Sequence, residues 1–200
     1  MPKDWPALCI GLIVGAYWAR VVKLVLKARR RTGRDANLVP PEALGRALRI
    51  VWYPTVILWI AFPLLHAWRP FGLIYAQPIV RWIAVAVATL AFAATLVCWK
   101  KMGRSWRMGI DPSEKTQLIV SGPYAFVRHP IYALSSVLMI ASVIAVPTVV
   151  MIIVACIHLL FLQWEARREE QHLVRVHGES YEKYMCGVGR FIPRFRAPSP

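Results

Sequence analysis

Two short polar segments contain residue types that bind charged small molecules. Residues 121–132 read SGPYAFVRHPIY, with an arginine and a histidine directly before a proline. Residues 164–184 contain two adjacent glutamates and then a glycine followed by two tyrosines three residues apart. Guanidinium and carboxylate groups form strong hydrogen bonds with ligands of opposite charge, and aromatic faces attract cations. We therefore expect the two segments to form a ligand site if the fold brings them together.

The first segment leads into a helix. The Gly-Pro pair at 122–123 is typical of a turn, and Pro130 suits the first turn of the helix that follows. Arg128 and His129 would then lie at a helix N-terminus, which favours anionic groups such as carboxylate or phosphate. Tyr132 lies about one turn further along. The alternative is that Arg128 and Tyr132 only anchor the helix at a membrane interface.

The second segment is predicted to form two helices. The first should end near Gly178, and a short second helix would place Tyr181 and Tyr184 on one face. For the charged stretch 165–170, the alternative is a solvated helix face whose glutamates and arginines pair at i,i+3 and i,i+4.

The composition indicates an all-α membrane protein. The chain is 58% hydrophobic with mean hydropathy +0.47, yet has 25 Lys+Arg against 10 Asp+Glu. Such a balance indicates apolar spans separated by basic loops and argues against a soluble nucleic-acid-binding protein. The four cysteines form no CxxC pair and have no metal-ligand spacing, so we expect free thiols and no metal site.

The uncharged runs predict five transmembrane helices, because crossing a bilayer takes about 20 apolar residues. The 35 residues from 130 to 164 carry no formal charge and as one helix would be about 50 Å long, so we expect Pro147 to divide them into a helical hairpin. Each arm is short, and whether the hairpin crosses fully or is partly re-entrant stays open. The predicted spans are about 5–26, 50–68, 82–99, 131–146 and 148–164, in one membrane domain, 1–200, with a cytoplasmic helical cap.

Loop charges predict the orientation. Residues 20–49, 99–130 and 164–200 carry nine, six and seven Lys/Arg, against three on the opposite side. By the positive-inside rule the N-terminus is outside and the C-terminus cytoplasmic, with the first span retained rather than cleaved. We interpret most basic loop residues as topology signals that also contact anionic lipids. The GxxxG at 11–15 permits close helix packing.

The two polar segments resemble the isoprenylcysteine carboxyl methyltransferase family and the related phospholipid N-methyltransferases. The shared motifs are G-P-Y-x-x-V-R-H-P-x-Y and then, after a hairpin, E-E-x-x-L, G-x-x-Y-x-x-Y and R-x-I-P. In this chain they are Gly122-Pro123-Tyr124, Val127-Arg128-His129-Pro130, Tyr132, Glu169-Glu170, Leu173, Gly178, Tyr181, Tyr184 and Arg190-Phe191-Ile192-Pro193.

The resemblance implies S-adenosylmethionine as methyl donor, bound by about residues 120–193 on the cytoplasmic side without a Rossmann domain. The sequence agrees, because no GxGxxG follows a strand-like run. By motif position, the cofactor-binding candidates are Arg128, His129, Tyr132, Glu170, Tyr181 and Tyr184, and the catalytic candidates are Arg190 and Glu169.

The expected acceptor is a hydrophobic, lipid-like or lipidated molecule, with a carboxylate among the candidate groups, that enters from the bilayer of a bacterial inner membrane. An N-methyltransferase of the same family is a second hypothesis, with His129 or His172 collecting the amine proton. A membrane NADPH-dependent reductase and a non-catalytic scaffold are further alternatives. The acceptor's identity and the oligomeric state stay open.

Overall fold

The protein is a helical bundle. The computed structural model describes residues 1–32, 43–103 and 118–194, and within these ranges it contains helices and no strand. The elements are α1 (Trp5–Thr32), α2 (Ala43–Trp68), α3 (Pro78–Met102), the 3₁₀ helix η2 (Gly122–Ala125), α4 (Pro130–Ala145), α5 (Val149–His177) and α6 (Glu179–Gly187). The predicted all-α class is therefore confirmed.

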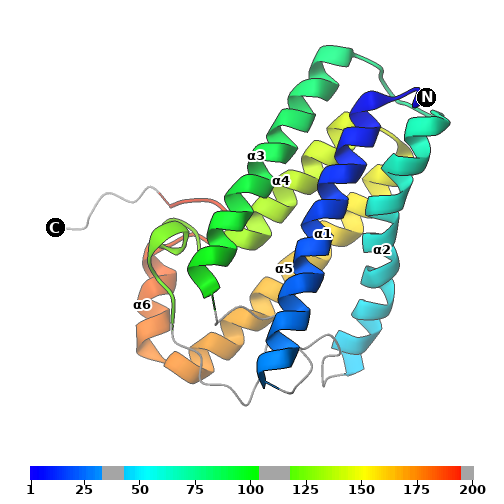
Figure 1. The fold of residues 1–200 in the computed structure, drawn as a ribbon. Helices are drawn as coiled ribbons and strands as arrows, with labels where there is room; N and C mark the ends of the chain where they lie inside the picture. Colours follow the sequence, from blue (N-terminus) through cyan, green and yellow to red (C-terminus); the bar gives the residue numbers. More distant parts are fainter. Residues whose placement is uncertain (33–42, 104–117, 195–200) are drawn as a thin grey trace.

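Five helices form a closed ring, and a sixth lies beyond one end of it. Helix α1 packs against α2 and α3, α2 against α5, and α4 against both α3 and α5. The N-terminus and the α2–α3 connection lie at one end of the bundle, and α6 packs on α5 at the other (Figure 1). We call these the N-terminal end and the α6 end.

The lengths and hydropathy of these helices are those of a membrane protein. Among the described residues, α1, α2, α3 and α5 are each long and apolar enough to cross a bilayer. Helix α4 is shorter, at 16 residues or about 24 Å. Large apolar side chains project outward from the bundle, among them Ile57, Leu90 and Leu160. A lipid environment accounts for this exposure.

The predicted hairpin is present, as α4 and α5 joined by residues 146–148. Thr148 caps α5, its hydroxyl accepting a hydrogen bond of 3.3 Å from the Met151 amide. The Ile74 amide donates to the Pro147 carbonyl at 2.8 Å, and the Tyr75 hydroxyl donates to the Ile144 carbonyl at 2.6 Å. The hairpin tip therefore lies level with the α2–α3 connection, at the N-terminal end.

Several helices extend past the predicted spans. Helix α1 continues through Arg29–Arg31 to Thr32, α2 begins at Ala43 rather than near 50, and α5 continues to His177. The uncharged runs predicted the apolar parts, but charged residues are good helix formers and prolong the helices beyond the bilayer.

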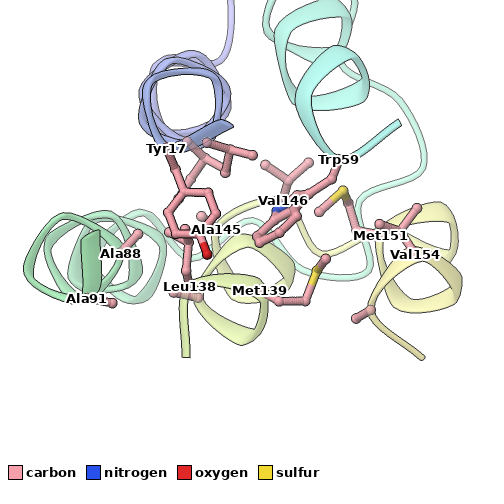
Figure 2. Close-up of a cluster of buried hydrophobic side chains, with 14 of the residues drawn as sticks. Tyr17, Trp59, Ala88, Ala91, Leu138, Met139, Ala145, Val146, Met151 and Val154 are labelled. Carbon is pink, nitrogen blue, oxygen red and sulfur yellow. The ribbon is translucent and has the colours of Figure 1, made fainter. Parts of the chain in front are cut away.

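Aromatic and aliphatic side chains from four helices meet inside the ring. Tyr17, Trp59, Leu138 and Met151 lie together at its centre (Figure 2). Gly11 brings α1 close to α2, because a Cβ there would lie 2.5 Å from Leu64 Cδ2. The GxxxG motif thus serves packing within this chain.

A buried charge cluster ties the helices together at the N-terminal end. Asp4 accepts from the Ala7 amide at 3.1 Å and pairs with both Arg81 and His66. Arg81 Nε also donates to the Ala145 carbonyl at 2.7 Å. Arg81 is one of the three basic residues on the side opposite the basic loops, but it lies in the first turn of α3 rather than in a loop. It is buried because Asp4 neutralises it.

Candidate active site

The two polar segments meet at the α6 end of the bundle. Val127 and Gly189 form an isolated parallel bridge, in which the Arg128 amide donates to the Gly189 carbonyl at 2.8 Å. The His129 amide donates to the Arg190 carbonyl at 3.1 Å. A Cβ at Gly189 would lie 1.9 Å from the Ile192 carbonyl oxygen, so the C-terminal segment makes this close turn only with glycine.

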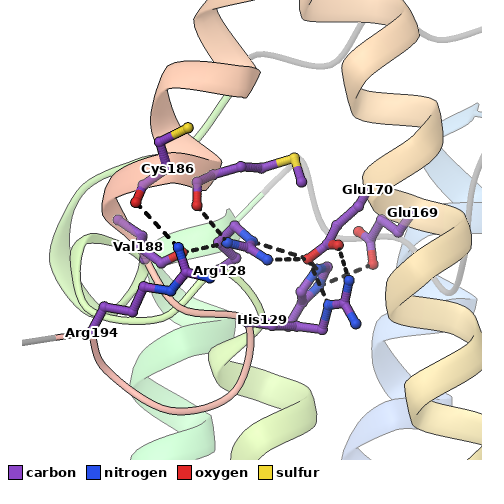
Figure 3. Close-up of polar contacts among 9 residues, drawn as sticks. Arg128, His129, Glu169, Glu170, Cys186, Val188 and Arg194 are labelled. Atoms are coloured by element: carbon purple, nitrogen blue, oxygen red, sulfur yellow. Dashed lines mark hydrogen bonds and ion pairs between the residues drawn. The ribbon is translucent and has the colours of Figure 1, made fainter.

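Arg128 links three elements through its side chain. Its Nε and Nη2 contact Glu170 Oε1 at 3.0 and 2.9 Å, and both residues are buried (Figure 3). Its Nη1 donates to the Met185 carbonyl at 2.9 Å and to the Val188 carbonyl. A buried ion pair overcomes its desolvation cost only when its remaining polar atoms also form hydrogen bonds. For Arg128 the two carbonyls at the end of α6 provide these bonds.

Glu170 is surrounded by cationic side chains. Besides Arg128, His129 Nε2 lies 3.3 Å from its Oε1. Arg190 Nε donates to Oε1 at 3.0 Å, and Arg190 Nη2 to Oε2 at 2.5 Å. One carboxylate thus fixes α4, α5 and the C-terminal segment relative to one another.

His129 lies between two carboxylates and two aromatic rings. Its Nδ1 is 3.6 Å from Glu169 Oε2, and its ring stacks on Tyr132 with centroids 5.4 Å apart. Phe191 packs edge-on at 6.1 Å. Burial lowers the His129 pKa, but hydrogen bonds to Glu169 and Glu170 outweigh burial and hold that pKa above its ordinary value.

Tyrosines line the side of the site formed by α6. Tyr181 and Tyr184 have ring centroids 5.8 Å apart, and the Tyr184 hydroxyl donates to the Tyr124 carbonyl at 2.5 Å. Burial raises the pKa of Tyr184 to about 12 and raises that of Tyr181, so both are neutral donors near pH 7. The buried Tyr124 hydroxyl has no hydrogen-bond partner within the described ranges.

A family model described as phospholipid methyltransferase matches residues 73–180. The chain belongs to this family. This family includes the isoprenylcysteine carboxyl methyltransferases, so the resemblance predicted from the sequence motifs is confirmed. Its four long apolar helices agree with membership of this family of membrane proteins.

A curated relative of this chain is the nickel-cobalt-cadmium resistance protein NccN of Alcaligenes xylosoxydans xylosoxydans. The two are 25% identical over 122 residues, which cover 59% of this chain and 56% of the relative. The chain thus spans only about half the length of that protein. Within the described ranges of this chain, no group of three or more His, Cys, Asp or Glu residues could hold a metal ion.

The fold brings the predicted site residues together. Arg128, His129, Tyr132, Glu169, Glu170 and Arg190 form one contact network, and Tyr181 and Tyr184 flank it on α6. The alternative of a solvated helix face is wrong for Glu165 and Glu170, which are both buried. Simple interface anchoring is wrong for Arg128, which pairs inside the protein. The roles assigned to these residues remain predictions.

Sequence reasoning missed two residues next to this network, Arg49 and Glu165, which form a buried ion pair. A signal for both was present. Arg49 is the last charge before the uncharged run of α2, and Glu165 is the first charge after the uncharged run of the hairpin. Charges at such borders lie where the helices leave the bilayer.

Proposed function

We propose that this protein is an S-adenosylmethionine-dependent methyltransferase whose acceptor is a hydrophobic, lipid-like molecule, with a carboxylate as the favoured methyl-accepting group. The observation that carries the proposal is the buried Arg128–Glu170 pair, flanked by Glu169 and by tyrosines, in a chain of the phospholipid methyltransferase family.

The residues at the site suit the chemistry of this cofactor, which supplies an activated methyl group on a sulfonium. Glu169 keeps 26% of its side chain exposed while Glu170 is closed in by cations, so a carboxylate is accessible for an ammonium group. Arg128 is the candidate partner for a carboxylate. The rings of Tyr181 and Tyr184 provide faces for a sulfonium, and the unpartnered Tyr124 hydroxyl is a further donor.

In this proposal the protein mainly aligns its two reactants and excludes water. Transfer of a methyl group to an anionic oxygen disperses charge in the transition state, so a site of low polarity favours the reaction. Holding donor and acceptor in line contributes most of the remaining acceleration. The acceptor enters from the bilayer of a bacterial inner membrane, and the site faces the cytoplasm, as the loop charges indicate.

N-methylation of an amine or phospholipid is a second candidate, favoured by the description of the matching family. An amine must lose a proton after transfer, and His129 with Glu169 at 3.6 Å offers an acceptor for it. The C-terminal segment that contains Arg190 belongs to the same site in either reaction.

Calorimetry on the purified protein in detergent tests the cofactor assignment. S-adenosylmethionine and its demethylated product should bind, whereas NADPH should not. Arg128→Gln and Glu170→Gln should each weaken cofactor binding by about ten-fold or more, because each removes a charged partner. Glu182→Gln, on the exposed face of α6, is the matched control. Binding of NADPH alone would overturn the proposal.

Loss of cofactor binding must be separated from loss of the fold, because Arg128 and Glu170 are part of a buried network. Glu169→Gln provides the second variant, since within the described residues this partly exposed carboxylate forms an ion pair only with His129, and glutamine has nearly the same size and shape. It should weaken cofactor binding while leaving the melting temperature close to that of the parent. Unchanged affinity in Arg128→Gln, Glu170→Gln and Glu169→Gln together would reject the assignment.

A further inference from the structure

A buried ion pair lies next to the proposed site but uses a residue outside the segment that matches the family. Arg49 of α2 places Nη2 2.8 Å from Glu165 Oε1 of α5, and the two side chains are only 5% and 3% exposed. The other oxygen of Glu165 lies 3.3 Å from Arg168 Nη1. Two cations therefore contact one buried carboxylate.

This pair is connected to the proposed methyl-transfer site through α4 and α5. Glu165 and Glu169 are four residues apart, so they lie on the same face of α5 about one turn, or 5.4 Å, from each other. Tyr132 of α4 stacks on His129, whose Nδ1 lies 3.6 Å from Glu169 Oε2, so it belongs to the site that α5 joins to Glu165.

The guanidinium of Arg49 is only partly satisfied. Its central carbon lies 5.1 Å from the centroid of Trp52 and 5.2 Å from that of Phe161, two rings that stack at 4.6 Å. Its Nε is buried and donates to no atom within the described ranges. Because buried N–H groups normally have partners, this donor points to a ligand. Arg190 differs, since both its Nε and Nη2 donate to Glu170.

The depth of the pair matches the level of lipid head groups. Arg49 directly precedes the uncharged part of α2, and Glu165 directly follows the uncharged run that ends at Trp164. Trp52, Val56 and Phe161 form an apolar cluster on the membrane side of Arg49. An acceptor with its head group at Arg49 would therefore keep its hydrocarbon chain against apolar side chains.

From these contacts we propose that Arg49 binds the anionic head group of the methyl acceptor, a carboxylate or a phosphate, with Arg168 adding positive charge. The inference rests on the proposed function and names a specificity residue for it. Arg49 selects acidic acceptors and holds them about one turn of α5 from Glu169, at the edge of the proposed cofactor site.

Binding of four single-chain probes in detergent tests this assignment: oleate, oleyl phosphate, oleyl alcohol and oleylamine. The parent protein should bind at least one anionic probe about ten-fold more tightly than the alcohol, and the amine no better than the alcohol. Preference for oleate indicates a carboxylate acceptor, and preference for oleyl phosphate a phosphate-bearing one. Tightest binding of the amine, or no preference at all, would overturn the proposal.

The variants must keep the fold, because removing Arg49 alone leaves a buried carboxylate without its partner. The double variant Arg49→Gln/Glu165→Gln removes both charges of the pair and leaves the net charge unchanged, so it should fold, and loss of its preference for anions would come from the missing Arg49 guanidinium. Arg46→Gln, exposed one turn earlier on α2, is the control and should keep that preference. Retention of the preference in the double variant would overturn the proposal.

Cofactor affinity separates this inference from the function on which it rests. In the double variant, S-adenosylmethionine should bind as in the parent, because Arg49 and Glu165 are not among the residues assigned to the cofactor. Failure of the parent to bind S-adenosylmethionine would overturn the proposed function. Normal cofactor binding without any anion preference would overturn only the role of Arg49.

Discussion

His129 is the residue at the site whose charge should depend on pH near neutrality. The groups around it are Glu169, Glu170, Tyr132 and Phe191. Its pKa in the folded protein lies above the ordinary value of 6.5, since the two glutamates stabilise the imidazolium more than burial opposes it. The contribution of the charged His129 to the stability of the folded protein is therefore fully present below about pH 6.5. It is lost as the pH rises through the pKa of His129 in the folded protein.

Replacing His129 by glutamine should remove this pH dependence. We expect the melting temperature of the parent in detergent to exceed that of His129→Gln most at pH 5.5, with the difference shrinking towards pH 8.5. Scanning fluorimetry across that range measures it, with the exposed Glu182→Gln as the control that retains the parent's profile. A difference that stays constant with pH would contradict the assignment of the proton to His129.

Contacts between single residues were predictable where a motif contained both of them, whereas a charge at the border of an uncharged run indicates only a depth in the membrane. The segments 121–132 and 164–184 predicted Arg128 and Glu170, because a hairpin necessarily returns its two arms to one face. The pair Arg49–Glu165 joins residues 116 positions apart, and sequence spacing contains no information on such a contact. His158 was likewise missed; its ring nitrogens contact Trp52 at 3.3 Å and Ser135 at 3.1 Å inside the bundle.

At the scale of the elements, hydrophobic length predicted the number of helices better than their ends. The uncharged run of 130–164 was too long for one span, and the division at Pro147 is where α4 and α5 are separated. The ends were missed because α1, α2 and α5 continue as helices into charged sequence. Helix α5 thereby extends Glu169 and Glu170 beyond the apolar run to the site, which an element ending at 164 could not do.

The close contact between α1 and α2 predicts opposite effects of two similar substitutions. A Cβ at Gly11 would lie 2.6 Å from Leu64 Cγ and 3.2 Å from the Leu64 amide nitrogen, whereas a Cβ at Gly15 would meet only Ile60 Cγ2 at 3.9 Å. Gly11→Ala should destabilise the protein by about 1–3 kcal/mol, because the helices must separate. Gly15→Ala should be neutral or stabilising by up to about 1 kcal/mol, because alanine is the better helix former.

Thermal unfolding in detergent of the two glycine variants measures these changes side by side. Both substitutions add one methyl group to α1 within a single turn, so each is the control for the other. Equal melting temperatures for Gly11→Ala and Gly15→Ala would contradict the proposed packing of α1 on α2.

In the whole molecule, the buried charges lie in groups at the two ends of the bundle. Asp4 and Arg81 form a buried ion pair at the N-terminal end, with His66 Nδ1 3.3 Å from Asp4 Oδ2. The network around Glu170 and the pair Arg49–Glu165 lie at the α6 end. Most basic residues also lie towards this end, but the site depends on a few buried charges. By the positive-inside rule, the net charge of +15 and its distribution predict that the α6 end faces the cytoplasm.

That orientation makes a prediction for the protein in its membrane. Cys186 on α6 and Lys3 before α1 are both exposed and lie at opposite ends of the bundle. With the α6 end in the cytoplasm, a membrane-impermeant maleimide should label a variant that retains only Cys186 in inverted vesicles and not in intact spheroplasts. Lys3→Cys in a cysteine-free background should label in spheroplasts. The reverse pattern would place the site outside, where no cellular S-adenosylmethionine is expected, and would contradict both the orientation and the proposed donor.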